Sequence, residues 1–254
     1  MKRKIEQSIE TIVAVLSKWD DVDTIAVIES GEDFYDPYFF ISVDCYCTGA
    51  IPPSHTRRDL FPGAVAFESL HASRKDRFLM RDIPFRIEYK DQSYFDSLLH
   101  TGEAPEGAFR DTGTYMLYRL RHGTVAFKRS DWIDEARKDL DALNQDFWNM
   151  LRTAFQARME HFLGDLHAAI AREDELFYLV SSSGFIRTAC SVLFVINHRF
   201  EPSGRLLASE TRKLSTLPDS FLGRFDSFLR TEPALKPNQK AEVADLLARS
   251  IVAL

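Results

Sequence analysis

Two short segments of the chain each set a carboxylate among alternating polar and apolar residues. In residues 39–47, Ser42 and Asp44 alternate with apolar neighbours, and in residues 84–90 Glu88 does the same. Because side chains alternate across a strand, Ser42 and Asp44 share one face of the first segment and the apolar residues share the other. Two such strands in one sheet would place both acids on the same side, where carboxylate oxygens suit a divalent cation. The pattern therefore predicts a divalent-metal site with Asp44 and Glu88 as ligands.

The first half of the chain alternates helical and strand patterns. Apolar residues recur at helical spacing near the N-terminus, which predicts a helix, and the short apolar segments that follow are typical of strands. Turn-forming residues such as Gly31, Gly49 and Pro52 separate them. The predicted elements are a helix over 5–16, strands over 24–28, 39–47, 64–67 and 83–90, a short helix over 92–99 and a last strand over 122–127. Together they predict a mixed sheet with a helix packed on it.

The pattern changes after Ser130, which is a suitable N-cap residue for a helix. Apolar residues then recur at helical spacing from Trp132 to Leu166 without a proline, which predicts one long helix or two with a kink. Further helices are predicted over 174–199, 219–230 and 238–253, with proline residues between them. We therefore predict an α+β protein with two domains, a mixed-sheet domain over 1–130 and an all-helical bundle over 131–254.

Composition restricts the partners and the compartment. A net charge of -6 argues against generic nucleic-acid binding, which usually requires a basic surface. The three cysteines form neither a disulfide framework nor a zinc-binding spacing, so we expect buried free thiols in a reducing cytoplasm. The apolar segment 176–196 contains Arg187 and several serines, which predicts a buried helix hairpin rather than a membrane span. We expect a cytoplasmic protein with no membrane partner.

The order of these motifs resembles the nucleotidyltransferase superfamily with the polymerase-β-like catalytic fold. That family has a strand ending in Gly-Ser, then a strand carrying Asp-x-Asp, and a third acid on a later strand. Here Glu29-Ser30 stands in the Gly-Ser place, Ser42-Val43-Asp44 in the Asp-x-Asp place, and Glu88 in the place of the third acid. Residues 121–127, 193–202 and 214–218 are similar to the passage into the family's helical substrate domain and to that domain itself.

The resemblance implies a metal-dependent reaction. In the family, three carboxylates hold two Mg²⁺ ions that brace a triphosphate and activate the attacking hydroxyl. The implied catalytic and metal-binding residues are Asp44 and Glu88, and Ser30 and Ser42 would lie near the phosphates of the nucleotide. The implied activity is transfer of a nucleoside monophosphate from a nucleoside triphosphate (NTP) to a hydroxyl of a small molecule or protein. The helical domain would hold this acceptor.

The chain departs from the family pattern at two positions, and the departures leave alternatives open. Glu29 replaces the glycine, and Ser42 replaces the first aspartate, for which Asp33 or Asp36 could substitute as a ligand. The alternative to a working transferase is a catalytically degenerate member that acts as a nucleotide-binding or protein-interaction module. An unrelated fold is the third interpretation; Asp44 would then be a solvent-facing strand residue, and Glu88 would pair with basic neighbours on its own strand.

One basic cluster outside these motifs also has two interpretations. The segment His55-Thr56-Arg57-Arg58 could contact a phosphate, because arginine suits bidentate anion recognition. We expect instead that it forms a solvated loop.

Overall fold

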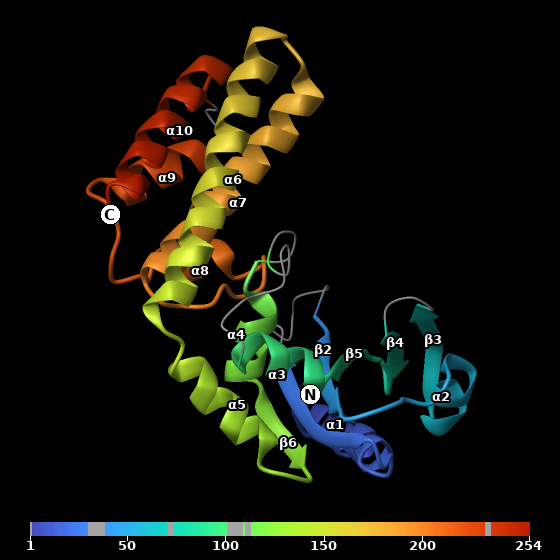
Figure 1. The fold of residues 1–254 in the computed structure, drawn as a ribbon. Helices are drawn as coiled ribbons and strands as arrows, with labels where there is room; N and C mark the ends of the chain where they lie inside the picture. Colours follow the sequence, from blue (N-terminus) through green and yellow to red (C-terminus); the bar gives the residue numbers. More distant parts are fainter. Residues whose placement is uncertain (1, 30–38, 71–73, 101–108, 110–112, 232–234) are drawn as a thin grey trace. The chain divides into compact units, whose positions relative to one another are not determined.

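The protein is described by a computed structural model that covers residues 2–29, 39–70, 74–100, 109, 113–231 and 235–254. The chain forms two compact units (Figure 1). The first contains Met1–Glu106 and Arg119–Ala142, and the second contains Gly107–Tyr118 and Leu143–Leu254. The single domain boundary near residue 130 stays a prediction. The compact units themselves are each built from two stretches of chain.

The first unit is built on a six-stranded mixed sheet with the strand order β3-β4-β5-β2-β1-β6. Among the described strands, every neighbouring pair is antiparallel except β2 and β5, which run parallel. The α+β class predicted from the sequence is confirmed. The strands are β1 (Val22–Glu29), β2 (Ile41–Cys47), β3 (Ala64–Leu70), β4 (Lys75–Met80), β5 (Ile83–Asp91) and β6 (Thr124–Lys128).

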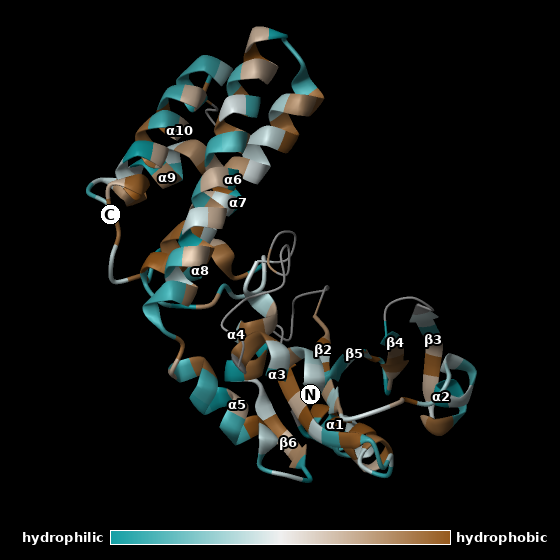
Figure 2. Cartoon of the chain, viewed as in Figure 1, coloured by the Kyte–Doolittle hydropathy of each residue, from teal (hydrophilic) through white to brown (hydrophobic). Residues whose placement is uncertain are grey.

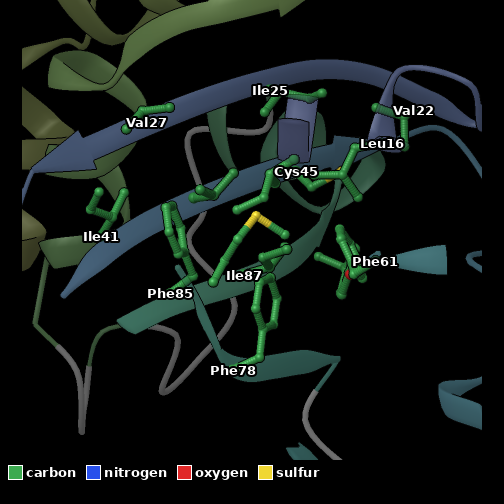
Figure 3. Packing of buried hydrophobic residues seen from close by; sticks show 14 of the residues in the cluster. Leu16, Val22, Ile25, Val27, Ile41, Cys45, Phe61, Phe78, Phe85 and Ile87 are labelled. Atoms are coloured by element: carbon green, nitrogen blue, oxygen red, sulfur yellow. The ribbon is translucent and has the colours of Figure 1, made fainter. Parts of the chain in front are cut away.

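The hydrophobic core of this unit lies on the apolar face of the sheet, where Ile25, Cys45 and Ile87 from three strands meet (Figure 3). Helix α1 (Lys2–Leu16) contributes its apolar side to the same cluster, because its residues recur at helical spacing. Cys45 and Cys47 are buried there as free thiols with their Sγ atoms 3.9 Å apart. The side-chain alternation predicted for β2 is therefore present, and its other face is left for polar groups.

Three more helices belong wholly to this unit: α2 (Ser54–Leu60), α3 (Gln92–His100) and α5 (Trp132–Asp141). The expectation of a solvated loop at residues 55–58 is wrong, because Arg57 is buried and its helix is held to the sheet. The Arg57 guanidinium donates from Nε and Nη2 to the two carboxylate oxygens of Asp76 on β4, at 2.8 and 2.9 Å.

The second unit is helical. Its described helices are α6 (Gln145–Ala171), α7 (Glu175–Ile196), α8 (Leu207–Thr211), α9 (Phe221–Leu229) and α10 (Pro237–Val252). A further helix, α4 (Tyr115–His122), contains the point where the chain passes from the second unit to the first. The helical run after Ser130 is two helices rather than one, because Asn144 caps α6 by accepting a hydrogen bond from the Phe147 backbone N–H at 3.0 Å.

Helix α7 is the one described helix that is long and apolar enough to cross a membrane by length and composition. Most of its apolar stretch is buried inside the protein, and it packs along α6 as its main neighbour. The turn that joins the two helices, Arg172–Asp174, is hydrophilic (Figure 2). The segment 176–196 is therefore buried, as the sequence predicts, but it forms one continuous helix that pairs with α6 and not a hairpin by itself.

Candidate functional site

The parallel pairing of β2 with β5 sets the polar faces of both strands side by side. Asp44 is the register partner of Glu88, and Ser42 is the partner of Arg86. The structure therefore brings together three of the four residues that the sequence singles out: Asp44, Glu88 and Ser42. The fourth, Ser30, lies outside the described residues, as do the possible substitute ligands Asp33 and Asp36.

A guanidinium group from α4 lies among these three side chains. Arg119 donates from Nε to Asp44 Oδ2 at 2.9 Å, and its Nη2 donates to Asp44 Oδ1. The same Nη2 also donates to the Ser42 hydroxyl at 2.7 Å. Nη1 lies 3.2 Å from Glu88 Oε1. One arginine therefore contacts both predicted metal ligands and Ser42.

Two lysines complete the cluster. Lys90 Nζ donates to Asp44 Oδ2 at 2.9 Å, and Lys75 Nζ lies 3.2 Å from Glu88 Oε1. The Asp44 side chain is fully buried, whereas 26% of the Glu88 side chain is exposed. Three cations thus face two carboxylates, so the fixed charges of the cluster sum to about +1 when all five groups are ionised.

The position of Arg119 follows from how the end of α4 is held on the sheet. A Cβ atom at Gly123 would lie 3.0 Å from the Ala26 Cβ on β1, so only a glycine permits this approach without a shift. Ala26 is in turn the register partner of Asp44. On the other side, Arg137 of α5 donates to the backbone carbonyls of Leu120 and Gly123. These contacts set the last turn of α4 over β1 and β2.

The charges change the proton affinities of the groups around them. Burial would raise the pKa of Glu88, but the cations of Arg119, Lys90 and Lys75 outweigh it and lower that pKa below the ordinary value. Burial lowers the pKa of Lys90, and the nearby Arg119 adds to this effect against the opposing attraction of Asp44. The lowered pKa keeps Glu88 as a carboxylate, whereas burial makes the charged form of Lys90 less favourable than it is in water.

The described residues of this cluster do not fit Mg²⁺. Both oxygens of Asp44 already accept N–H groups, and Glu88 Oε1 faces two cationic side chains. A divalent ion between the acids would lie within a few ångströms of Arg119 and both lysines. In addition, no group of three His, Cys, Asp or Glu side chains that could hold a metal occurs in the part of the chain that the structure describes. Arg119 lies between the two acids, where a metal ion would lie, and it supplies positive charge there.

More basic residues continue the polar face beyond the cluster. On β4 and β5, Arg77 and Arg86 are directly opposite each other and both are exposed. Like charges in that arrangement repel, and Arg77 has the acidic Glu68 of β3 as its register partner on the other side. Arg86 also lies over the Phe40 ring, with its guanidinium carbon 3.6 Å from the ring centroid. Among the described residues, basic side chains therefore outnumber acidic ones on this part of the polar face.

Sequence reasoning missed Arg119, and little in the sequence distinguishes it from Arg121. Both lie on α4, two residues apart, but Arg121 is 39% exposed and pairs with Asp141 at 2.7 Å. The apolar Leu117 and Leu120, both fully buried, are the local signs that part of this helix faces inward. Lys90 is one of the basic neighbours of Glu88 on its own strand, yet its hydrogen bond goes to Asp44.

Comparisons with known proteins found a solved structure with a similar architecture. The chain matches no protein-family model and no curated protein sequence. Among solved structures it is similar to the crystal structure of a nucleotidyltransferase-like protein from Exiguobacterium sibiricum 255-15, with a TM-score of 0.52 and 11% sequence identity. The match covers 98% of this chain and 74% of the other chain. The resemblance drawn from the sequence is thus confirmed at the level of the fold: the chain has a nucleotidyltransferase-like fold.

Proposed function

We propose that this chain is a catalytically degenerate nucleotidyltransferase-fold protein that binds a phosphate-bearing ligand, such as a nucleoside triphosphate, without a divalent metal. The observation that carries the proposal is the engagement of both Asp44 oxygens by Arg119 and Lys90. In the family that the fold resembles, those oxygens would be ligands of Mg²⁺. Here the protein's own cations satisfy them.

The charge on the polar face supports binding of an anion. Arg119, Lys75 and Lys90 supply three positive charges where the family would use metal ions. Guanidinium groups bind phosphate oxygens in pairs and need no metal to do so, and the exposed Arg77 and Arg86 extend the same face. The buried free cysteines fit the reducing, cytoplasmic location that we propose with it.

The competing function is the Mg²⁺-dependent transfer of a nucleoside monophosphate to a hydroxyl of a small molecule or protein. It would require Arg119 to leave Asp44, which breaks two charge-assisted hydrogen bonds and leaves a fully buried carboxylate. A second form of the degenerate interpretation is a protein-interaction module with no nucleotide ligand. The three functions differ in what they predict for titrations with a triphosphate.

Titration calorimetry with ATP and GTP, in EDTA and again in excess Mg²⁺, separates these functions. We expect binding in EDTA that Mg²⁺ does not strengthen, and we expect no incorporation when an α-labelled triphosphate is offered with candidate hydroxyl acceptors. Arg77→Met and Arg86→Met should each weaken binding by about tenfold, because each removes a charge-assisted contact. Arg58→Met, an exposed arginine on α2, is the matched control and should bind as the wild type does.

Other results would assign a different function. Binding that requires Mg²⁺ and is abolished by Asp44→Ala would favour the transferase. If neither triphosphate binds under any condition, nucleotide binding is wrong and the protein-interaction module remains. Ser42→Asp offers a further check: alone it should bring no Mg²⁺ dependence, because Arg119 still holds Asp44.

A further inference from the structure

The first two turns of α7 present an exposed apolar face that the proposed function does not use. Leu176, Leu179 and Val180 are spaced i, i+3 and i+4, so they lie on one side of the helix. Their exposed fractions are 72%, 64% and 55%, and the two leucines are the most exposed large apolar side chains among the described residues. Apolar side chains that gather on one exposed face indicate an interaction site, whereas single scattered ones do not.

A groove adjoins this face, and Leu179 belongs to both. The volume of the groove is about 740 Å³, and its apolar lining includes Ile170 of α6, Tyr178 and Leu179 of α7, and Pro237 of α10. All of the lining residues belong to the second unit, so this unit forms the groove by itself. The volume lies within the range of about 300–1,000 Å³ that is typical of binding pockets. The groove is therefore large enough to receive apolar side chains of a partner.

Acidic side chains border the groove at the hydrophilic turn before α7 (Figure 2). Glu173, Asp174 and Glu175 line it, and Lys236 is the one cationic side chain among its described lining residues. When all four groups are ionised, their charges sum to about −2. Arg172 precedes the three acids in the sequence but does not line the groove. The three acids are exposed, so their charges are accessible to a partner.

We propose that this face and groove bind an amphipathic helix of a partner protein, with basic residues beside the apolar stripe of that helix. Apolar side chains of the partner at helical spacing would cover Leu176 and Leu179 and enter the groove beside Tyr178. Lysine or arginine residues next to that stripe would lie near Glu173 and Glu175, and this charge complementarity favours a basic partner over an acidic one. The inference is independent of the proposed function, because it involves neither the sheet nor a triphosphate.

Fluorescence anisotropy on the full-length chain tests this assignment with three labelled peptides of about 18 residues, or five helical turns. The first peptide has leucine on one helical face and lysine on the other. The second has glutamate in place of lysine, and the third has the composition of the first in an order that gives no apolar face. We expect saturable binding of the first peptide, about tenfold weaker binding of the other two, and weaker binding of the first in about 0.5 M NaCl.

Substitutions on the apolar face locate the bound peptide. Leu176→Asn and Leu179→Asn should each weaken binding of the first peptide by about tenfold, since each removes an apolar contact. Both side chains are exposed, so the variants should fold as the wild type does, which a thermal melt checks. Leu246→Asn is the matched control, because Leu246 is 46% exposed on α10 and does not line the groove. It should bind the peptide as the wild type does.

Substitutions at the acids test the charge complementarity. Glu173→Gln and Glu175→Gln should each weaken binding of the first peptide by about threefold, because each removes one exposed charge pair. Asp174 is left unchanged, since its side chain caps α7 by accepting from the Phe177 backbone N–H at 2.9 Å. Glu242→Gln, at an exposed position of α10 outside the groove, is the matched control and should leave the affinity unchanged.

Several outcomes would overturn the proposal. Absence of binding of the first peptide to folded wild-type protein would do so, as would equal affinity for the glutamate peptide. Wild-type affinity in both leucine variants would place the peptide elsewhere. If sedimentation shows that the wild type self-associates and that Leu179→Asn is a monomer, the face binds a second copy of this chain instead. If the wild type binds phosphatidylcholine vesicles and Leu179→Asn does not, the face binds lipid instead.

Discussion

Two of the described aspartates in the first unit are completely buried, and their surroundings differ. Asp76 faces the core side of the sheet, where Arg57 binds both of its oxygens and the Tyr89 hydroxyl donates to Oδ2 at 2.7 Å. Arg57 also donates to the Pro52 carbonyl and to the Ser69 hydroxyl, at 2.7 Å each. One cation meets one anion, and the bonds that remain are to neutral groups.

Asp44 lies on the polar face of the sheet, where two cationic side chains bind its single negative charge. Arg119 and Lys90 both bind it, and Arg119 extends further to Glu88 and Ser42. A structural ion pair gains nothing from a second buried cation, whose desolvation is costly. The Asp76 pair is thus balanced in charge, whereas the Asp44 cluster has an excess of positive charge, as the metal-free anion site that we propose requires.

The largest effect is expected for Arg57→Met. It leaves Asp76 buried with only a tyrosine hydroxyl, so we expect the free energy of unfolding to fall by about 3–5 kcal/mol in urea titrations. A loss below about 1 kcal/mol would mean that solvent reaches Asp76 and that the two sites do not differ as described.

Arg119→Met should cost less, about 2–3 kcal/mol, because Lys90 still compensates Asp44 and Lys75 still faces Glu88. It should also create a difference that the wild type lacks: Mg²⁺ should raise the melting temperature of Arg119→Met but not that of the wild type or of Arg57→Met. Arg121→Met, on the same helix with an exposed pair, is the control and should lose less than about 1 kcal/mol. Equal Mg²⁺ responses in all four proteins would show that Arg119 does not stand in for a metal.

Lys90→Met is expected to cost about 1 kcal/mol or less, since Arg119 keeps both Asp44 oxygens bonded. The pH dependence of the difference in stability between the wild type and Lys90→Met tests the lowered pKa of Lys90. Burial lowers the pKa of Lys90 in the folded state, so between that value and the ordinary 10.5 the unfolded chain binds more protons. The stability of the wild type should therefore rise with pH relative to Lys90→Met in this window. A constant difference between the two unfolding curves would contradict the lowered pKa.

Glu88→Gln should have the smallest effect on stability, and this effect should be present near neutral pH and disappear in acid. The pKa of Glu88 is lowered in the folded protein, so its contribution is complete above its ordinary value of 4.5 and is lost as the pH falls through the lowered value. Acid unfolding monitored by circular dichroism should be shallower in Glu88→Gln over that range. The exposed Glu68 supplies the control substitution, and identical acid curves for both variants would argue against the contact with Arg119.

Much of the fold could be predicted from the sequence, because burial follows periodicity. The alternation in residues 39–47 gave the faces of β2 correctly, and helical spacing gave α7, α9 and α10 within a few residues. Helices α2 and α4 were missed, because they are short and carry charged side chains that are buried only in the folded protein. The residues next to Arg57 and Arg119 in the sequence would predict that both arginines are exposed, but both are buried.

The sequence by itself determined the fold class, the two strands that carry the acids, and the shared face of Ser42 and Asp44. These properties depend on residue type and on the repeat of the backbone, which are local. Only the tertiary structure decided what occupies the acids, because Arg119 reaches Asp44 across 75 positions of the chain. The charge balance of a buried site depends on distances between residues far apart in sequence, and the long-range packing of the folded chain sets those distances.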